Sequence, residues 1–186
     1  MNNYIIKQIN LDEYPNCNAI WNMQTCPYTD MFIEQIKAGN RDVFILTVGD
    51  EYIAECDLVY DNPEYGTIPG ERLYFSRLIV KRSERGKGYG EAISLYLLSK
   101  AKEKGYKSIT LGVDCDNTAA VNLYKKLGFT VYEEGETIAE KRVTRHNGRS
   151  GKNGVYNPKH NDRSFNLSNA EHIDYFAMLN LVQFAT

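Results

Sequence analysis

Short runs of alternating or clustered apolar residues divide the chain into segments that are typical of β-strands. We expect strands over residues 3–9, 42–48, 52–60, 73–80, 107–113 and 129–133. The two-residue connection Gly49-Asp50 predicts that the second and third of these segments pair as a hairpin. A last apolar stretch over 173–184 is interpreted as a buried strand, although Ser168 followed by Glu171 is also typical of a helix capping box, so a helix stays open there.

Apolar residues spaced three and four positions apart predict the helical regions. These are residues 11–38, in two pieces broken near Pro27, residues 89–104 and residues 117–127. Asn117 or Thr118 is expected to cap the last of these helices. Along the chain, the predicted elements follow the order β, α, α, β, β, β, α, β, α, β. This order predicts an α/β (α+β) layer fold, in which crossover helices appear only in the second half.

A glycine-rich loop, Arg85-Gly86-Lys87-Gly88-Tyr89-Gly90, lies directly between a predicted strand and a predicted helix. Three glycines at alternate positions let backbone N–H groups approach a ligand closely, and the start of the helix adds its positive dipole end. Together they predict an anion site, for which a pyrophosphate is the natural occupant. The loop matches neither the P-loop nor the G-x-G-x-x-G dinucleotide pattern, so on its own it is equally consistent with a structural turn.

A second motif lies one helix and one strand further on. Residues 117–129 read NTAAVNLYKKLGF and fit the pattern N-x-x-A-x-x-L-Y-x-x-x-G-F. Here the sequence resembles the GNAT superfamily of N-acetyltransferases, whose acetyl-CoA signature [RQ]-x-x-G-x-[GA] is matched by Arg85, Gly88 and Gly90. The resemblance is clear over residues 73–133, looser over 1–72 and weak after 134.

The resemblance implies a mixed, mostly antiparallel sheet that is splayed between its fourth and fifth strands. It implies that acetyl-CoA is the cosubstrate and that the pantetheine arm pairs with the exposed backbone of Leu78, Ile79 and Val80. It also implies that the pyrophosphate is held by the loop and that Asn117 contacts the cofactor. The loop residues concerned are Arg85, Gly86, Lys87, Gly88, Tyr89, Gly90 and Glu91.

The catalytic roles implied by the resemblance concern Tyr124 first, as the general acid that protonates the departing CoA thiolate. A backbone N–H at the splayed strand, that of Ile79 or Val80, is expected to stabilise charge on the thioester oxygen. No histidine precedes residue 146, so the base that deprotonates the amine is expected to be a carboxylate. Glu55 and Glu71, beside the central strands, are the candidates.

These residues also have purely structural interpretations. The spacing of Tyr124 with Leu123 and Leu127 is typical of a core tyrosine, and Asn117 is a good helix cap in any case. Trp21 and Phe32 are explained equally well by helix packing or by an acceptor pocket. A second functional hypothesis is therefore a non-catalytic acyl-CoA-binding regulatory module on the same fold, which needs the loop but not the phenol.

The charge of the chain narrows the set of partners. With 22 Lys and Arg against 24 Asp and Glu, the net charge is −2, which excludes a strongly basic nucleic-acid binder as a whole-chain interpretation. Residues 141–163 carry seven basic residues and one acidic residue, whereas the other 15 basic and 23 acidic residues sum to −8. That balance favours a cationic amine acceptor, either a small molecule or a peptide. A third hypothesis assigns function to the basic segment, with nucleic acid or an acidic protein as partner.

The remaining expectations concern compartment, metals and the end of the chain. Four cysteines without C-x-x-C spacing and three late histidines predict no metal site. No apolar run is long enough to span a membrane, and no export signal is recognised, so a cytoplasmic protein is expected. We expect one domain over 1–186, with a Gly/Asn-rich insertion over 135–172. The last strand then lies over the cleft, swaps into a second subunit of a homodimer, or is disordered.

Overall fold

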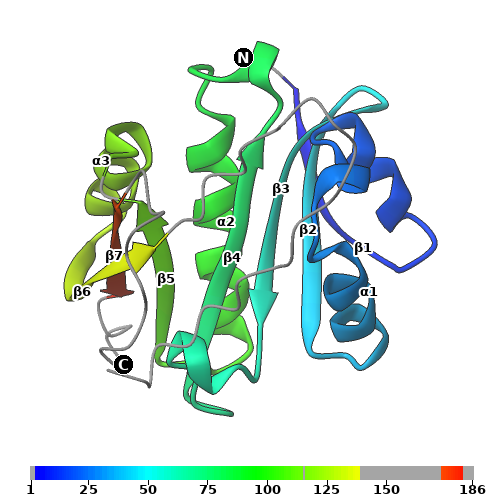
Figure 1. Cartoon of the computed structure of the whole chain (residues 1–186). Coiled ribbons are helices and arrows are strands. Elements are labelled where there is room, and N and C mark those ends of the chain that lie inside the picture. The colour runs from blue at the N-terminus through cyan, green and yellow to red at the C-terminus, as the bar shows by residue number, and fades with distance from the viewer. Residues whose placement is uncertain (1–2, 115, 139–172, 182–186) are drawn as a thin grey trace, which may run out of the picture.

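The central feature of the fold is one seven-stranded sheet in the order β1-β2-β3-β4-β5-β7-β6 (Figure 1). The computed structural model describes residues 3–114, 116–138 and 173–181. The strands are β1 Ile5–Ile9, β2 Arg41–Val48, β3 Glu51–Val59, β4 Arg72–Val80, β5 Ser108–Asp114, β6 Phe129–Ile138 and β7 Ile173–Leu181. This architecture confirms the predicted mixed, mostly antiparallel sheet.

The first four strands form an antiparallel meander, and β2 and β3 form the hairpin that the Gly49-Asp50 connection predicts. Between β1 and β2 the chain forms two short 3-10 turns, η1 (Tyr14–Ala19) and η2 (Met23–Thr25), and then helix α1 (Thr29–Lys37). The prediction of two helical pieces over 11–38 is thus wrong for the first piece. Between η1 and η2 the Asn22 side chain accepts a hydrogen bond from the Gln24 N–H, and Asn18 Oδ1 accepts from the Met23 N–H. These side-chain bonds compete with helical main-chain bonds and keep that piece from forming one continuous helix.

The second half contains the crossover helices. Helix α2 (Tyr89–Glu103) connects β4 to the parallel strand β5, and helix α3 (Thr118–Lys126) connects β5 to β6. The glycines after both helices, Gly105 and Gly128, adopt φ of 84° and 92°, the left-handed conformation that ends a helix. The predicted bounds of both helices agree with the structure to within one or two residues.

Two separate apolar clusters cover the two faces of the sheet. On one face α2 and α3 pack through residues that include Ile93, Leu97 and Tyr124 against Phe44, Leu58 and Phe75 of the strands. On the other face η1, η2 and α1 pack through Tyr14, Met23 and Phe32 against Val43 and Ile45 of β2. The sheet therefore separates two layers. One contains α2 and α3 and borders the glycine loop, and the other contains η1, η2 and α1 from the first third of the chain.

The parallel pair β4 and β5 stays together only at its start. The pairing joins Arg72, Leu73 and Tyr74 to Ser108, Ile109 and Thr110, and no further pairs follow. Beyond this point the two strands diverge (Figure 1). The predicted splay between the fourth and fifth strands is confirmed, and it lies at the end of β4 that leads into the glycine loop.

Strand β7 confirms the strand predicted over 173–184. It lies between β5 and β6 and is antiparallel to both. Strand β6 reaches Ile138, so it includes the first residues of the expected 135–172 insertion. The rest of that insertion, including the basic segment 141–163, lies outside the described residues.

Candidate active site

The glycine loop presents an uncapped helix terminus. Gly88 is the N-cap residue of α2 with φ 86°, no side chain forms a capping hydrogen bond to this helix start, and Gly86 has φ 76°. A residue with a Cβ atom would be strained at either position. The first-turn N–H groups of this 15-residue helix therefore receive no side-chain cap, which is the arrangement that the predicted anion site requires.

Of the charged side chains around the loop, one fixes the loop to β4 and the others form ion pairs. The Arg85 Nε donates to the Val80 carbonyl over 3.1 Å and so ties the loop to the end of β4. Lys87 forms an exposed ion pair of 2.8 Å with Glu84. The Glu91 carboxylate, which would repel an anion at this helix end, is paired over 2.7 Å with Lys126 of α3. The ion pair of Glu91 therefore reduces the negative charge beside the predicted phosphate site.

A cleft of about 340 Å³ lies at the splay. Strand β4 lines it with Tyr74, Phe75, Arg77 and Leu78, strand β5 with Gly112, Val113 and Asp114, and the α3 region with Asn117, Ala120 and Tyr124. Of the residues predicted for the site, the structure thus brings Leu78, Asn117 and Tyr124 into one cavity. Ile79 and Val80 continue β4 toward the loop and do not line this cavity.

Tyr124 combines burial with a place in the cleft. Its side chain is 6% exposed and its ring meets the rings of Phe75 and Phe129 edge to face, at centroid distances of 6.2 and 5.5 Å. Burial raises the pKa of the Tyr124 phenol above its ordinary value of 10.0, so the group stays protonated at neutral pH. The core interpretation and the acid interpretation are compatible, because the ring packs in the core while the residue lines the cavity.

Asn117 has two roles as well. Its side chain accepts a hydrogen bond from the Ala120 N–H over 3.2 Å, which makes it the cap of α3, and the residue also lines the cleft. Asp114, at the end of β5, is the one carboxylate among the residues that line the described cleft, and it is exposed. Its position at a strand end next to the second motif is a signal that the sequence interpretation did not use.

The two carboxylates predicted as bases lie elsewhere. Glu71 is exposed just before β4 begins, at the end of the strand opposite the loop, and its carbonyl accepts from the N–H groups of Lys107 and Ser108. Glu55 is fully buried: its Oε1 accepts from Arg77 and its Oε2 accepts from the Trp21 indole over 2.6 Å. Neither side chain lines the cleft, so the structure does not bring either one together with Tyr124.

Comparison with known protein families identifies the family of this chain. Residues 4–129, more than half of the chain, match the family described as Acetyltransferase (GNAT) family. The chain belongs to the GNAT acetyltransferase family. The matched range contains the glycine loop, both cleft-lining strands and α3, which agrees with the family named from the two motifs.

Curated relatives of this GNAT chain are mycothiol acetyltransferases. The protein from Renibacterium salmoninarum is 44% identical over 54 residues, which cover 29% of this chain and 16% of the relative. The protein from Corynebacterium glutamicum is 33% identical over 94 residues, which cover 50% of this chain and 30% of the relative. The chain therefore spans less than a third of the length of either relative.

Solved structures share the GNAT fold over almost the whole chain. The ribosomal-protein-S18-alanine N-acetyltransferase from Escherichia coli has a TM-score of 0.69 at 14% identity, with 99% of this chain and 97% of that chain covered. The yncA structure from Salmonella typhimurium, solved with its cofactor acetyl-CoA, has a TM-score of 0.64 at 16% identity, with 96% and 92% covered. At such identities the likeness concerns the fold alone.

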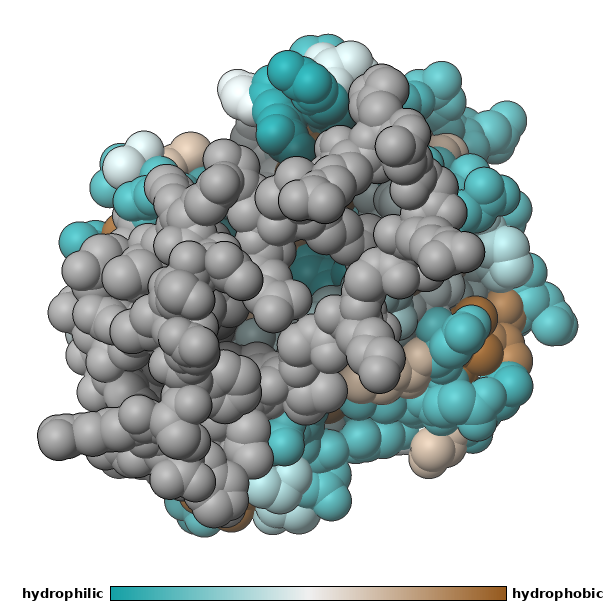
Figure 2. All heavy atoms as spheres, in the orientation of Figure 1, coloured by the Kyte–Doolittle hydropathy of each residue, from teal (hydrophilic) through white to brown (hydrophobic). Residues whose placement is uncertain are grey.

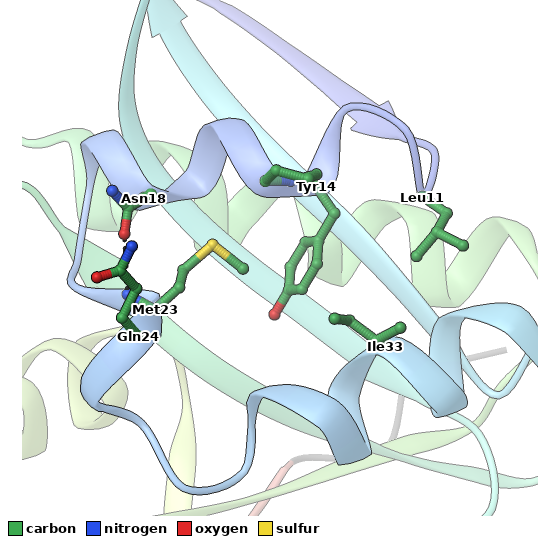
Figure 3. Close-up of a pocket in the computed structure, with 7 residues that line it drawn as sticks. Leu11, Tyr14, Asn18, Met23, Gln24 and Ile33 are labelled. Carbon is green, nitrogen blue, oxygen red and sulfur yellow. Dashed lines mark hydrogen bonds between the residues drawn. The ribbon is translucent and has the colours of Figure 1, made fainter.

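A larger pocket of about 520 Å³ lies apart from the GNAT cleft (Figure 3). It opens between η1, η2 and α1, and its lining includes Tyr14, Met23 and Ile33. No residue predicted for the cofactor or for catalysis lines it. Figure 2 shows apolar surface on the side of the molecule that carries these elements, whereas most of the other described surface in that view is hydrophilic.

Within the part of the chain that the structure describes, two classes of feature are absent. No helix there is long and apolar enough to cross a membrane. No group of three or more His, Cys, Asp and Glu side chains gathers there in a way that would hold a metal ion. The polar side chains that line the described cleft are the phenols of Tyr74 and Tyr124, the Arg77 guanidinium, the Asp114 carboxylate and the Asn117 amide.

Proposed function

We propose that this protein is an acetyl-CoA-dependent N-acetyltransferase that moves an acetyl group directly to a primary amine while both substrates are bound. One observation carries the proposal: the splay cleft joins Tyr124 and Asn117 to the strand that leads into an uncapped helix start. Its residues fit acetyl-CoA, because the first-turn N–H groups of α2 suit a pyrophosphate and the unpaired part of β4 suits an extended arm.

The chain's own groups then divide the work of acetyl transfer. Holding the amine and the thioester in one cleft supplies the proximity contribution to the rate. The Leu78 N–H, at the cleft-lining part of β4, donates to the oxygen on which negative charge develops. It replaces the N–H groups of Ile79 and Val80 in this role, because Leu78 lines the cleft and those residues do not. Tyr124 donates its proton to the departing thiolate.

The amine must lose a proton before or during its attack. We assign this step to Asp114, which lines the cleft and is exposed, so it can accept the proton directly or through water and pass it to solvent. Glu71 is left out because of its distance along β4, and Glu55 because both of its oxygens already accept hydrogen bonds from protein groups. The acceptor is proposed to be a cationic small molecule or a basic peptide, in keeping with the −8 charge outside residues 141–163.

Two measurements on the full chain test this function. Calorimetric titration with CoA should release or absorb heat with one site, and acetyl-CoA should yield free thiol when polyamines, aminoglycosides or basic peptides are added. Heat of binding without thiol release from any amine would support the non-catalytic acyl-CoA-binding module instead. The absence of any heat with CoA would remove both proposals.

A further inference from the structure

Arg77 has an unusual backbone for its residue type. Among the described residues it is the one non-glycine with a positive φ, at 58°. The pairing of β3 with β4 shifts here, from Glu55 opposite Ile79 to Asp57 opposite Ser76, so Arg77 and Leu78 together bulge out of the ladder. Both residues line the cleft. The conformation of Arg77 therefore decides how the Leu78 N–H is presented.

Three side chains hold Arg77: Glu55 of the neighbouring strand β3, and Trp21 and Phe32 of the layer that η1, η2 and α1 form. Its Nε donates to Glu55 Oε1 over 3.3 Å, and its guanidinium lies 3.9 Å from the ring centre of Trp21 and 4.5 Å from that of Phe32. The Trp21 indole in turn donates to Glu55 Oε2 over 2.6 Å. Arg77, Glu55 and Trp21 thus form a closed set of contacts, here called the Arg77 lock, in which each member touches the other two.

Stability alone does not account for the lock. A left-handed backbone is unfavourable for arginine, and a buried ion pair gains little over apolar packing. In addition, Arg77 Nη2 is buried with no hydrogen-bond partner among the described residues. A strained residue with an unsatisfied donor persists where the surrounding structure enforces it, and such residues gather at functional sites.

The geometry points to Arg77, Glu55 and Trp21 as positioning residues for acetyl transfer: the lock fixes the β4 bulge so that the Leu78 N–H faces the thioester oxygen. This inference rests on the proposed function, which it deepens. It gives Glu55 a role other than the base that the sequence suggested. It also predicts that damage to the lock impairs the site for the acetyl group but not the site for the phosphates, which belongs to the loop.

The same layer offers a matched control. Arg41 and Asp57 form a second buried ion pair, with side chains 3% and 0% exposed, and the Arg41 guanidinium lies 4.5 Å from the centre of the same Phe32 ring. Arg41 begins β2 and lines no part of the cleft. Replacing it with lysine disturbs a buried charge of the same kind, together with its 3.3 Å contact to Ser76 Oγ beside the bulge, but removes no contact of the Arg77 lock.

The experiment compares four variants of the full chain: Arg77→Lys, Trp21→Phe, Arg77→Gly and Arg41→Lys. Trp21→Phe keeps a ring beneath the guanidinium but removes the N–H that holds Glu55. Arg77→Gly relieves the backbone strain but removes the lock. For each variant we measure kcat, the KM for acetyl-CoA, the Kd values of acetyl-CoA and CoA, and the urea midpoint, which shows that the protein is folded.

The first three variants should lower kcat by about tenfold or more, since small misplacements of a catalytic group cost this much. They should also raise the Kd of acetyl-CoA relative to the Kd of CoA, because only acetyl-CoA carries the thioester oxygen. The Kd of CoA itself should stay within about twofold of wild type. Arg41→Lys should lower the urea midpoint yet leave kcat and the Kd ratio within about twofold.

Two outcomes overturn the inference. If Arg77→Gly keeps wild-type kcat and Kd ratio, the bulge needs no lock. If the lock variants and Arg41→Lys change kcat in proportion to their loss of stability, the lock is only structural. Failure of the proposed function looks different, because the wild-type protein itself would then release no thiol with any amine.

Discussion

The two faces of the sheet bury different kinds of side chains. On the face covered by α2 and α3 the fully buried side chains are mostly aliphatic and aromatic, among them Leu73, Ile93, Leu97 and Leu111. On the face covered by η1 and α1 the protein buries Arg41, Asp57 and Glu55 and most of Arg77. The first face meets the cofactor loop, and the second supports β4 from behind.

This difference shows two ways of building one site. The phosphate site and the splay use main-chain groups, which an apolar face can position without burying any charge. The face covered by η1 and α1 instead holds β4 through buried side-chain ion pairs. In such a pair, removing one charge leaves the other buried and unpaired, which is destabilising. Substitutions on the two faces should therefore have separable effects. On the first face they should change CoA binding and proton transfer, and on the second they should change the free energy of unfolding, with a loss of kcat only where the Arg77 lock is altered.

The largest effect is expected for Arg41→Ala. Burial raises the pKa of Asp57 to about 7 even though Arg41 opposes the shift, so Asp57 depends on its partner. Removing one member of a buried pair costs roughly 3–5 kcal/mol. The folded variant then holds a proton on Asp57 that the unfolded chain releases above about pH 4, so its free energy of unfolding should fall as pH rises from 5 to 8. Urea unfolding at several pH values measures this.

The control for that prediction is Arg41→Ala combined with Asp57→Asn, which removes the unpaired carboxylate. The double variant should lose the pH dependence that the single variant shows. Equal pH slopes for both proteins would contradict the assignment of the effect to Asp57.

The second largest effect is expected for Tyr124→Phe. Loss of a general acid lowers kcat on the order of 100-fold, while the retained ring preserves its contacts with Phe75 and Phe129. The Kd of CoA and the urea midpoint should stay close to wild type. Because burial raises the pKa of Tyr124, the wild-type kcat should not fall on the alkaline side until above about pH 10. An unchanged kcat in the variant would show that Tyr124 serves packing only.

A smaller effect separates local strain from binding. Gly88 and Gly105 have φ of 86° and 84°, and a Cβ atom at either would meet nothing within 4 Å. Alanine at each position should therefore cost about 1–2 kcal/mol of folding free energy. Only Gly88→Ala should also weaken CoA binding, since Gly88 begins α2 at the loop whereas Gly105 follows its end. Equal CoA affinities in the two variants would argue against a phosphate site at this helix start.

The smallest effect concerns exposed charges. Lys87 and Lys37 both form ion pairs of 2.8 Å with a glutamate three residues away. Neither lysine should matter much for stability when it is replaced by alanine. Lys87→Ala should weaken CoA binding a few-fold at low salt and less at high salt, whereas Lys37→Ala should not change it. Calorimetry at two ionic strengths distinguishes these outcomes.

Local patterns in the sequence determined much of the molecule. The apolar periodicity over 89–104 and 117–127 predicted helices α2 and α3. Gly88 in the glycine loop indicated that α2 would begin there without a side-chain cap. The Asn117 side chain accepts from Ala120 three residues on, and the Tyr124 ring contacts Phe129 five residues on. Such features depend on neighbours in the chain, and so the sequence alone displays them.

Tertiary structure decided the features that join distant segments. The lock joins Trp21, in the connection between η1 and η2, to Glu55 of β3 and Arg77 of β4. The bulge that it holds follows from the register between β3 and β4. The exclusion of Glu71 from the cleft and the inclusion of Asp114 depend equally on which strand ends meet. A carboxylate's role depends on what surrounds it in space, and only the pairing of the strands determines those surroundings.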